Sequence, residues 1–336
     1  MINNLQSNLK SVESPSPSPG NSSWSFLFSY YKYKHFIENL GISYGTFYQE
    51  WSNNTALITE LNSRPLVSGD WIWAFYLPLV SQIKVILESK SYPIILGLSG
   101  LPGSGKSTFG KTLEFISSYM NIPINVISMD DFYLPSSQLD KAMKGNPWKV
   151  PRGLPGSHSI TEIEESLNRY AESGVLIAPQ FDKSLRSGLG ERSGVIKGKP
   201  KVLILEGWFL GCLPLNNPLA FRDDHFNLAL TEEEINYRNI VQDCLYSYKP
   251  IWKKFFKTWH LKAKDFSYTM LWKSQQEQNL LKTYGSALQG NQLNSFIRMI
   301  NTSIPQKSLQ NIDSDVTLVL NKSRNISDIL CKINEY

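Results

Sequence analysis

Cysteine is scarce in this chain of 336 residues, and the pattern of the few that are present argues against several kinds of site. Cys212, Cys244 and Cys331 are the only three, and their wide spacing matches neither a Cys-x-x-Cys motif nor a set of metal ligands. An odd number of unpatterned cysteines fits a reducing compartment, where thiols act as small apolar side chains. We therefore expect no cysteine-ligated metal.

Long apolar runs are also missing. No stretch approaches roughly 18 consecutive apolar residues, the length that predicts a transmembrane helix. The first residues lack a basic segment followed by an apolar one, so no signal peptide is predicted. These absences favour a cytoplasmic protein with no membrane partner.

The chain has no dense basic patch. Its 34 Lys and Arg residues exceed its 29 Asp and Glu residues by only five, and they are spread along the sequence. Proteins that bind nucleic acid usually concentrate such residues, so no nucleic-acid partner is expected. A mildly basic balance suits a small anionic ligand instead, while the oligomeric state cannot be predicted.

Composition divides the chain into three parts. Residues 1–23 are polar and carry alternating Ser-Pro pairs, which favour an extended, disordered tail. Residues 24–90 are rich in aromatic and aliphatic residues at helical spacing, so we expect a helical N-terminal cap, with a kink at Pro78. Residues 91–336 are expected to form the main domain.

Short apolar runs alternate with helical patterns in the main domain. Strands are predicted at 93–98, 124–128, 201–205, 226–230 and 315–320, and helices at 106–120, from Thr231 onward and at 328–336. Nearly uninterrupted apolar strands are typical of a parallel sheet that is buried on both faces. The predicted fold is α/β, a three-layer P-loop NTPase with a mainly parallel sheet and a helical N-terminal cap.

A glycine-rich loop follows the first of these strands. It matches the pattern Gly-x-x-x-x-Gly-Lys-Ser/Thr in full, with a predicted strand before it and a helix after it. Glycine lets several backbone N–H groups turn toward phosphate oxygens, and the helix presents its positive end to the same anion. We expect Lys106 to reach the β- and γ-phosphates of a nucleoside triphosphate and Ser107 to bind Mg²⁺. The loop comprises Gly100, Leu101, Pro102, Gly103, Ser104, Gly105, Lys106 and Ser107, with Thr108 directly behind it.

Acidic residues follow two other predicted strands. Asp130 and Asp131 come after residues 124–128, at the sheet edge where ligands bind in open α/β folds. Asp130 is the candidate general base for an acceptor hydroxyl, with Asp131 orienting the loop or the metal shell; the alternative is a solvated pair that caps the next helix. Glu206 follows four apolar residues and is the candidate Mg²⁺ ligand, directly or through water.

Three glycine-rich or polar segments lie between these acids, at 150–158, 180–184 and 190–192, and we interpret them as loops. They contain Arg152, His158, Asp182, Lys183 and Arg192, which are candidate ligands of an anionic, hydroxylated acceptor. Each is equally well explained as an ordinary charged loop residue.

Two later segments combine aromatic and charged residues, at 252–257 and 272–277. Aromatic residues between lysines occur in proteins that bind single-stranded nucleic acid. An amphipathic helix with its lysines in water is the preferred interpretation, and a lid that brings positive charge over the phosphates is a third.

These motifs together resemble the D-glycerate 3-kinases of plants and cyanobacteria and their fungal relatives. The resemblance spans about residues 94–305 and rests on the phosphate loop and on segments 128–133, 152–158, 181–184, 190–192 and 205–211, which occur in the same order. The family is similar in fold to phosphoribulokinase, uridine kinase and pantothenate kinase. This similarity implies a parallel sheet with a mobile lid, the use of ATP and Mg²⁺, and an aspartate after the second strand as the base.

The resemblance implies that Asp130 is the base, that Lys106 and Ser107 contact phosphate and metal, and that Glu206 lies near Mg²⁺. It also makes the five loop residues named above candidates for the acceptor site, together with Asp131, and it implies a lid near Lys273, where some relatives have arginine. The implied reaction is phosphorylation of D-glycerate to 3-phosphoglycerate, which in a photosynthetic organism belongs to photorespiratory salvage. Alternatives are a kinase of the same fold with another acceptor, an ATPase driven by a partner, and a silent ATP-binding scaffold.

Overall fold

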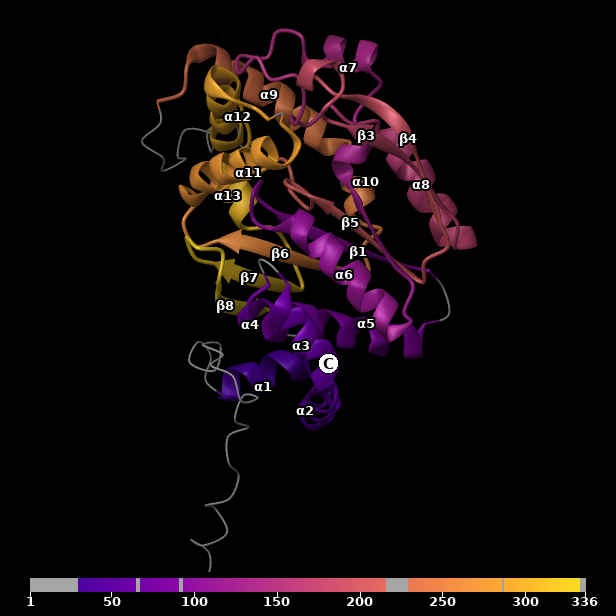
Figure 1. Cartoon of the computed structure of the whole chain (residues 1–336). Coiled ribbons are helices and arrows are strands. Elements are labelled where there is room, and N and C mark those ends of the chain that lie inside the picture. Colours follow the sequence, from indigo (N-terminus) through magenta and orange to yellow (C-terminus); the bar gives the residue numbers. More distant parts are fainter. Residues whose placement is uncertain (1–29, 65–66, 91–92, 216–228, 286, 333–336) are drawn as a thin grey trace, which may run out of the picture.

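The computed structural model of the chain describes residues 30–64, 67–90, 93–215, 229–285 and 287–332 (Figure 1). The predicted disordered tail, residues 1–23, lies outside these ranges. So do residues 226–228 of the strand predicted at 226–230, and residues 229 and 230 are not in a strand.

One six-stranded sheet forms the centre of the molecule, with its strands in the order β2-β5-β1-β6-β7-β8. All neighbouring pairs are parallel except β7 and β8, so the prediction of a mainly parallel sheet is confirmed. A separate antiparallel hairpin pairs β3 with β4. The strands are β1 (Ile94–Gly100), β2 (Ile124–Ser128), β3 (Leu176–Asp182), β4 (Glu191–Gly198), β5 (Val202–Gly207), β6 (Lys257–Ala263), β7 (Val316–Leu320) and β8 (Ile326–Cys331).

Helices cover the sheet on two sides. In Figure 1 the N-terminal helices lie below the sheet, and α9, α11, α12 and α13 lie above it, which gives the three layers of the predicted class. The helices are α1 (Tyr30–Asn39), α2 (Tyr44–Asn53), α3 (Thr55–Ser63), α4 (Gly69–Trp71), α5 (Leu77–Ser89), α6 (Lys106–Met120), α7 (Ser136–Met143), α8 (Ile160–Ser173), α9 (Glu232–Tyr246), α10 (Lys249–Trp252), α11 (Tyr268–Tyr284), α12 (Gly290–Thr302) and α13 (Gln306–Gln310).

Aromatic side chains join the N-terminal helices to the sheet. The indole of Trp259 in β6 lies 5.4 Å from the ring of Phe75 and 6.4 Å from that of Phe36, measured between centroids. Its N–H donates to the buried amide of Gln82 at 2.9 Å, so the one polar atom of this large side chain is satisfied. The two regions therefore share one hydrophobic core. The domain boundary at residue 90 remains a prediction.

The stretch Gly69–Ser89 is a continuous helical segment of 21 residues that includes a π-helical turn, Ile72–Tyr76, which ends two residues before Pro78. By length and composition alone it qualifies as a membrane span, but 72% of its most apolar window is buried inside the protein. It packs against α6 and β6 through Phe75, which also lies 5.0 Å from the ring of Phe109. A core helix of a globular protein explains its apolar character.

The helix predicted at 328–336 is wrong for the described residues, because the chain forms strand β8 there and residues 333–336 lie outside the description. A turn with Arg324 at a φ of +66° precedes it. This turn folds the chain back against β7, and the apolar residues Ile326 and Ile329 are buried beside it. The pairing with a strand already present decides the local structure, which periodicity over a few residues does not reveal.

Two other expectations need correction. The segment 252–257 is not an amphipathic helix: α10 ends at Trp252, and strand β6 begins at Lys257. The segments 180–184 and 190–192 are not only loops, since Gln180–Asp182 and Glu191–Arg192 belong to the β3–β4 hairpin. In β3 and β4, polar residues such as Gln180 and Lys197 interrupt the apolar ones. Neither strand therefore matches the apolar pattern of a buried parallel strand.

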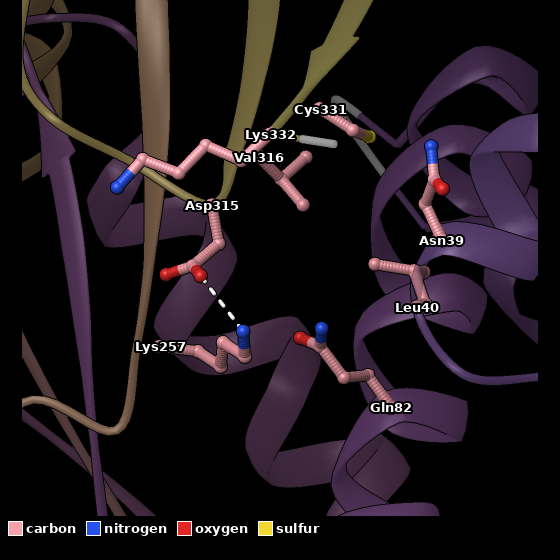
Figure 2. Close-up of a pocket in the computed structure, with 8 residues that line it drawn as sticks. All are labelled: Asn39, Leu40, Gln82, Lys257, Asp315, Val316, Cys331 and Lys332. Atoms are coloured by element: carbon pink, nitrogen blue, oxygen red, sulfur yellow. Dashed lines mark hydrogen bonds and ion pairs between the residues drawn. The ribbon is translucent and has the colours of Figure 1, made fainter. Parts of the chain in front are cut away.

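A small hollow separates the N-terminal helices from the N-terminal ends of β6 and β7 (Figure 2). Its volume of about 10 Å³ is barely that of one water molecule. Lys257 and Asp315 form an ion pair of 2.8 Å on its wall, and the amide of Gln82 points into it. The hollow lies at the sheet edge opposite the phosphate loop, and its size excludes a substrate.

Asp70 connects the N-terminal helices to the β7–β8 turn. Its buried carboxylate accepts the N–H of Ile326 at 2.6 Å and the hydroxyl of Ser68. We expect Asp70→Ala to lower the free energy of unfolding by about 1–3 kcal/mol, because a buried N–H loses its acceptor. Urea unfolding measures this change.

The control is Asp313→Ala, whose carboxylate is 75% exposed and pairs with Lys332 at the surface. Its effect should stay within about 0.5 kcal/mol. Equal losses in the two variants would show that Asp70 does not hold this junction.

Candidate functional site

The carboxyl ends of three neighbouring strands bring the main candidates together. In the parallel register Leu98 of β1 and Ser128 of β2 both pair with Glu206 of β5. The phosphate loop begins two residues after Leu98, and Asp130 lies two residues after Ser128. The loop, Glu206 and Asp130 therefore emerge side by side at one edge of the sheet, as the sequence predicts.

The phosphate loop has the backbone that its glycines permit. Gly103 and Gly105 have φ values of +77° and +110°, which other residues adopt only with strain. A Cβ on Gly103 would lie 2.6 Å from the backbone carbonyl carbon of Trp272 in α11. The loop is thus held tightly between α6, which begins at Lys106, and the N-terminal half of α11.

Lys106 lies inside this loop. Its ammonium donates to the carbonyl oxygens of Gly100 and, at 3.2 Å, of Leu101, and it lies 4.0 Å from the carboxylate of Glu206. Burial lowers the pKa of Lys106, while Glu206 and Asp130 oppose this change. Burial raises the pKa of Glu206, and Lys106 opposes that change. The ammonium of Lys106 can bind an anion, and the carboxylate of Glu206 can bind a cation next to it. The side chain of Ser107 lies outside the description.

Asp130 forms the second centre of charge. Its Oδ2 accepts from the ammonium of Lys183 at 2.6 Å, and its Oδ1 lies 3.8 Å from Nε2 of His158. Burial would raise the pKa of Asp130, but Lys183 and His158 outweigh burial and hold that pKa well below its usual range. Because the Lys183 side chain is 53% exposed, water screens this pair. Asp130 is ionised and is reachable from solvent.

Two of the predicted acidic residues, Asp131 and Asp182, bind the surrounding backbone. The carboxylate of Asp131 accepts the N–H groups of Ser128 and Phe181 at 3.1 and 3.4 Å, which agrees with its predicted role in orienting the loop. Burial raises its pKa to about 6. Asp182 caps the following turn by accepting from the backbone and hydroxyl of Ser184 at 2.8 and 2.6 Å.

The two arginines fix the β3–β4 hairpin. Arg152 is 6% exposed and donates through Nη1 to the carbonyl oxygens of Gly188 and Leu189 at 2.7 and 2.9 Å. Arg192 forms a two-bond ion pair with Glu162 and also donates to the carbonyl oxygen of Tyr133 at 2.5 Å. Their contacts with an acceptor remain predictions.

Segment 272–277 is helical, as part of α11, but the prediction that its lysine faces water is wrong, because Lys273 is buried. Its ammonium donates to Glu277 at 2.5 Å and lies 4.8 Å from the centroid of the Phe296 ring. Burial lowers its pKa, Glu277 opposes this, and the positive charges of Lys183 and Arg152 lower it further. Lys273 therefore belongs to the same electrostatic environment as the Asp130 region.

Two residues that shape the site lie outside the sequence motifs. Arg324, from the β7–β8 turn, donates to the carbonyl oxygens of Gly103 at 2.6 Å and Trp272 at 3.2 Å, so a residue more than 200 positions away supports the phosphate loop. The hydroxyl of Tyr248, in the turn between α9 and α10, lies 2.9 Å from Nδ1 of His158. Neither residue belongs to a local motif, and no signal in the sequence connects them to the loop.

The described residues include no cluster of three His, Cys, Asp or Glu side chains suited to a metal ion. A second hollow, of about 400 Å³, is lined by Pro93–Ile95 and Lys253–Phe256 among others. Like the hollow of Figure 2, it is lined by none of the predicted site residues. The candidate site rests on the geometry of the strand ends.

Known proteins resemble this chain over most of its length, although no family model matches it. The Schizosaccharomyces pombe protein described as uncharacterized kinase mug58 is 30% identical over 249 residues, which are 68% of this chain and 86% of that protein. The chloroplastic D-glycerate 3-kinase of Arabidopsis thaliana is 28% identical over 248 residues, 67% of this chain and 52% of that protein. The match thus spans about half the length of the plant enzyme.

A solved structure shows the same fold. It is the D-glycerate 3-kinase from Cryptococcus neoformans, with a TM-score of 0.64 and 22% sequence identity. The alignment covers 75% of this chain and 96% of that structure. At this identity the likeness establishes the fold alone.

Gly103→Ala tests the phosphate loop. We expect it to weaken ATP binding at least about tenfold, because the new methyl group forces the loop away from α11 and disturbs the N–H groups that face phosphate. Gly145→Ala is the matched control, since Gly145 has a φ of +80° but no atom within 4 Å of a built Cβ. Calorimetric titration with ATP measures both affinities.

Both substitutions should cost about 1 kcal/mol or more of stability through backbone strain, which thermal unfolding reports separately. Unchanged ATP affinity in Gly103→Ala would contradict the assignment of the loop.

Proposed function

Because the chain belongs to the kinase family that includes mug58 of Schizosaccharomyces pombe, we propose that it transfers the γ-phosphoryl group of ATP to the 3-hydroxyl of D-glycerate. The products are 3-phosphoglycerate and ADP. The relative from Arabidopsis is a D-glycerate 3-kinase by name, which supports this acceptor.

One observation carries the assignment of a phosphotransferase with a small acceptor. An ionised carboxylate, Asp130, lies beside the lysine of a phosphate loop closely enough to affect its pKa, and Glu206 lies between them on β5. A nucleotide switch can orient its attacking water with an uncharged glutamine, so it does not require a base at this edge. A kinase needs one to receive the proton of the acceptor hydroxyl.

The charges around Asp130 favour an anionic acceptor. Lys183 acts on the pKa of Lys106, Arg152 acts on that of Lys183, and both Lys183 and Arg152 act on that of Lys273. The three lysines lie near Glu206, Asp130 and Glu277, whereas Arg152 donates only to backbone carbonyl oxygens among the described contacts. A small hydroxy acid would supply the missing negative charge, whereas a nucleoside would not.

In the proposed reaction the bond between the γ-phosphorus and the β,γ-bridging oxygen breaks, and a bond to the acceptor's 3-hydroxyl oxygen forms. Asp130 receives the hydroxyl proton. Lys183 turns from Asp130 to the carboxylate of glycerate and thereby frees the base. Lys106 and the loop N–H groups neutralise charge on the phosphates.

The residues at the site fit Mg²⁺, which supplies charge neutralisation on the β- and γ-phosphates when bound. Mg²⁺ usually binds through one or two carboxylates together with substrate phosphates, not through a cage of protein ligands. Glu206, 4.0 Å from Lys106, is such a carboxylate, and Ser107 is the second proposed ligand. The free state of Cys212, Cys244 and Cys331 supports the further proposal of a cytoplasmic location.

The direct test is ADP release from Mg-ATP in a coupled assay, with D-glycerate, glycerol, uridine or pantothenate as the acceptor. We expect release that requires D-glycerate and yields 3-phosphoglycerate. Glycerol is the informative control, because it has the hydroxyl groups but no carboxylate. Release with uridine or pantothenate alone would keep the kinase and replace the acceptor, and release without any acceptor would favour a partner-driven ATPase.

Asp130→Asn tests the base. The amide keeps the size of the side chain but accepts no proton, so we expect kcat to fall by roughly 10²- to 10⁴-fold with little change in ATP affinity. Asp140→Asn is the control, because this exposed aspartate pairs only with Arg186 among the described contacts. Full turnover by Asp130→Asn with normal ATP binding would refute the assignment.

A further inference from the structure

His158 is held rigidly at the edge of the site. It is 3% exposed, and its ring stacks on that of Tyr133 with centroids 4.5 Å apart and planes 21° apart. Phe209 contacts it edge-on at 5.7 Å. These aromatic contacts fix the plane of the imidazole, so the identity of the groups at its two nitrogens decides what it can do.

Nδ1 faces the hydroxyl of Tyr248 at 2.9 Å. The oxygen of this hydroxyl accepts the backbone N–H of Gly156 at 3.1 Å. Burial raises the pKa of Tyr248, and the backbone N–H groups of Gly156 and His158 oppose that rise. Among the described contacts Nδ1 is the one acceptor within reach of this hydroxyl, so its single proton is directed to Nδ1.

No other proton donor competes at Nδ1 among the described residues. The hydroxyl of Ser157 lies 3.5 Å from Nδ1, but it donates to the carbonyl oxygen of Leu154 at 2.5 Å. Burial lowers the pKa of His158, opposed by Asp130, which favours the neutral ring. A neutral imidazole that accepts at Nδ1 carries its proton on Nε2.

Nε2 is buried and makes no hydrogen bond within the described part of the chain. It faces Oδ1 of Asp130 at 3.8 Å, while Oδ2 of the same carboxylate is bound by Lys183. The N–H dipole of Nε2 therefore points at one oxygen of the proposed base, and the other oxygen is the one that faces an exposed, movable lysine.

We propose that Tyr248 and His158 form a positioning relay for Asp130, in which the Tyr248 hydroxyl fixes the His158 tautomer so that the Nε2–H group orients the carboxylate. Oδ1 faces the Nε2–H dipole of His158 across 3.8 Å, and Oδ2 is left to take the acceptor proton when Lys183 turns away. The opposite tautomer would place a lone pair against the carboxylate and turn it out of line. This inference rests on the proposed role of Asp130 as the base.

The tautomer is measured directly by ¹⁵N NMR of the histidine side chains in the full-length protein. The chain has only four histidines, and the His158→Gln variant identifies the signals of His158. We expect a neutral ring protonated at Nε2, and a shift of this population in Tyr248→Phe, which keeps the aromatic ring but removes the hydroxyl. A wild-type ring protonated at Nδ1, or on both nitrogens at neutral pH, overturns the proposal.

Kinetics tests the consequence for Asp130, with the acceptor that the wild-type protein uses. We expect Tyr248→Phe to lower kcat by roughly 10- to 100-fold while KM for ATP changes little, because the base is misplaced but the phosphate loop is intact. His158→Gln, which retains an N–H near the position of Nε2, should keep more activity than His158→Leu. Equal loss in the Gln and Leu variants, or unchanged kcat in Tyr248→Phe, contradicts the relay.

Tyr170→Phe is the matched control. Tyr170 is also buried, and its hydroxyl donates to the carbonyl oxygen of Ile94 at 3.2 Å, in β1 at the opposite end from the phosphate loop. Its kcat should stay at the wild-type value. If the wild-type protein releases no ADP with any acceptor, the proposed function fails while the tautomer measurement still decides the relay.

Discussion

The parallel register of β2, β5 and β1 is the constraint on which the site depends. In a parallel sheet the loops that follow the strands all lie at the same edge, so three segments that are distant in sequence lie close together there. The phosphate loop, Glu206 and Asp130 follow strands whose paired positions are level across the sheet. A register shift of one strand by a single residue would move its loop and reverse which face its side chains occupy.

The charges at this edge stabilise one another. Lys106 lies near Glu206, Asp130 near Lys183, and Lys273 is paired with Glu277. A buried charge without a partner would strongly destabilise the fold. The ion pairs lower this cost and allow several charged side chains to lie close together at this edge. Among the described contacts Arg152 bonds only backbone carbonyl oxygens, so it is the one cation of this group without a carboxylate partner.

Structural features that depend on neighbouring residues could be predicted from the sequence, whereas those that depend on distant residues could not. The phosphate loop, α6, the capping threonine of α9 and the apolar strands β1, β2, β5 and β7 follow from neighbouring residues, and the structure confirms them. Strand β6 was missed because His260 and Lys262 interrupt its apolar residues, and β8 because only pairing with β7 makes it a strand. Tyr248 and Arg324 act on the site across long sequence separations, which no local pattern encodes.

The β3–β4 hairpin explains why so many candidate residues of the acceptor site make backbone contacts. Asp131 holds Phe181 and Arg152 holds the turn at Gly188, while Arg192 attaches β4 to α8. These contacts place Lys183, at the end of β3, against Asp130 from 53 positions away. A motif of charged residues therefore need not be a set of ligands. Here most of its members position one lysine and one carboxylate, and the precision of that pair is what a phosphoryl acceptor would require.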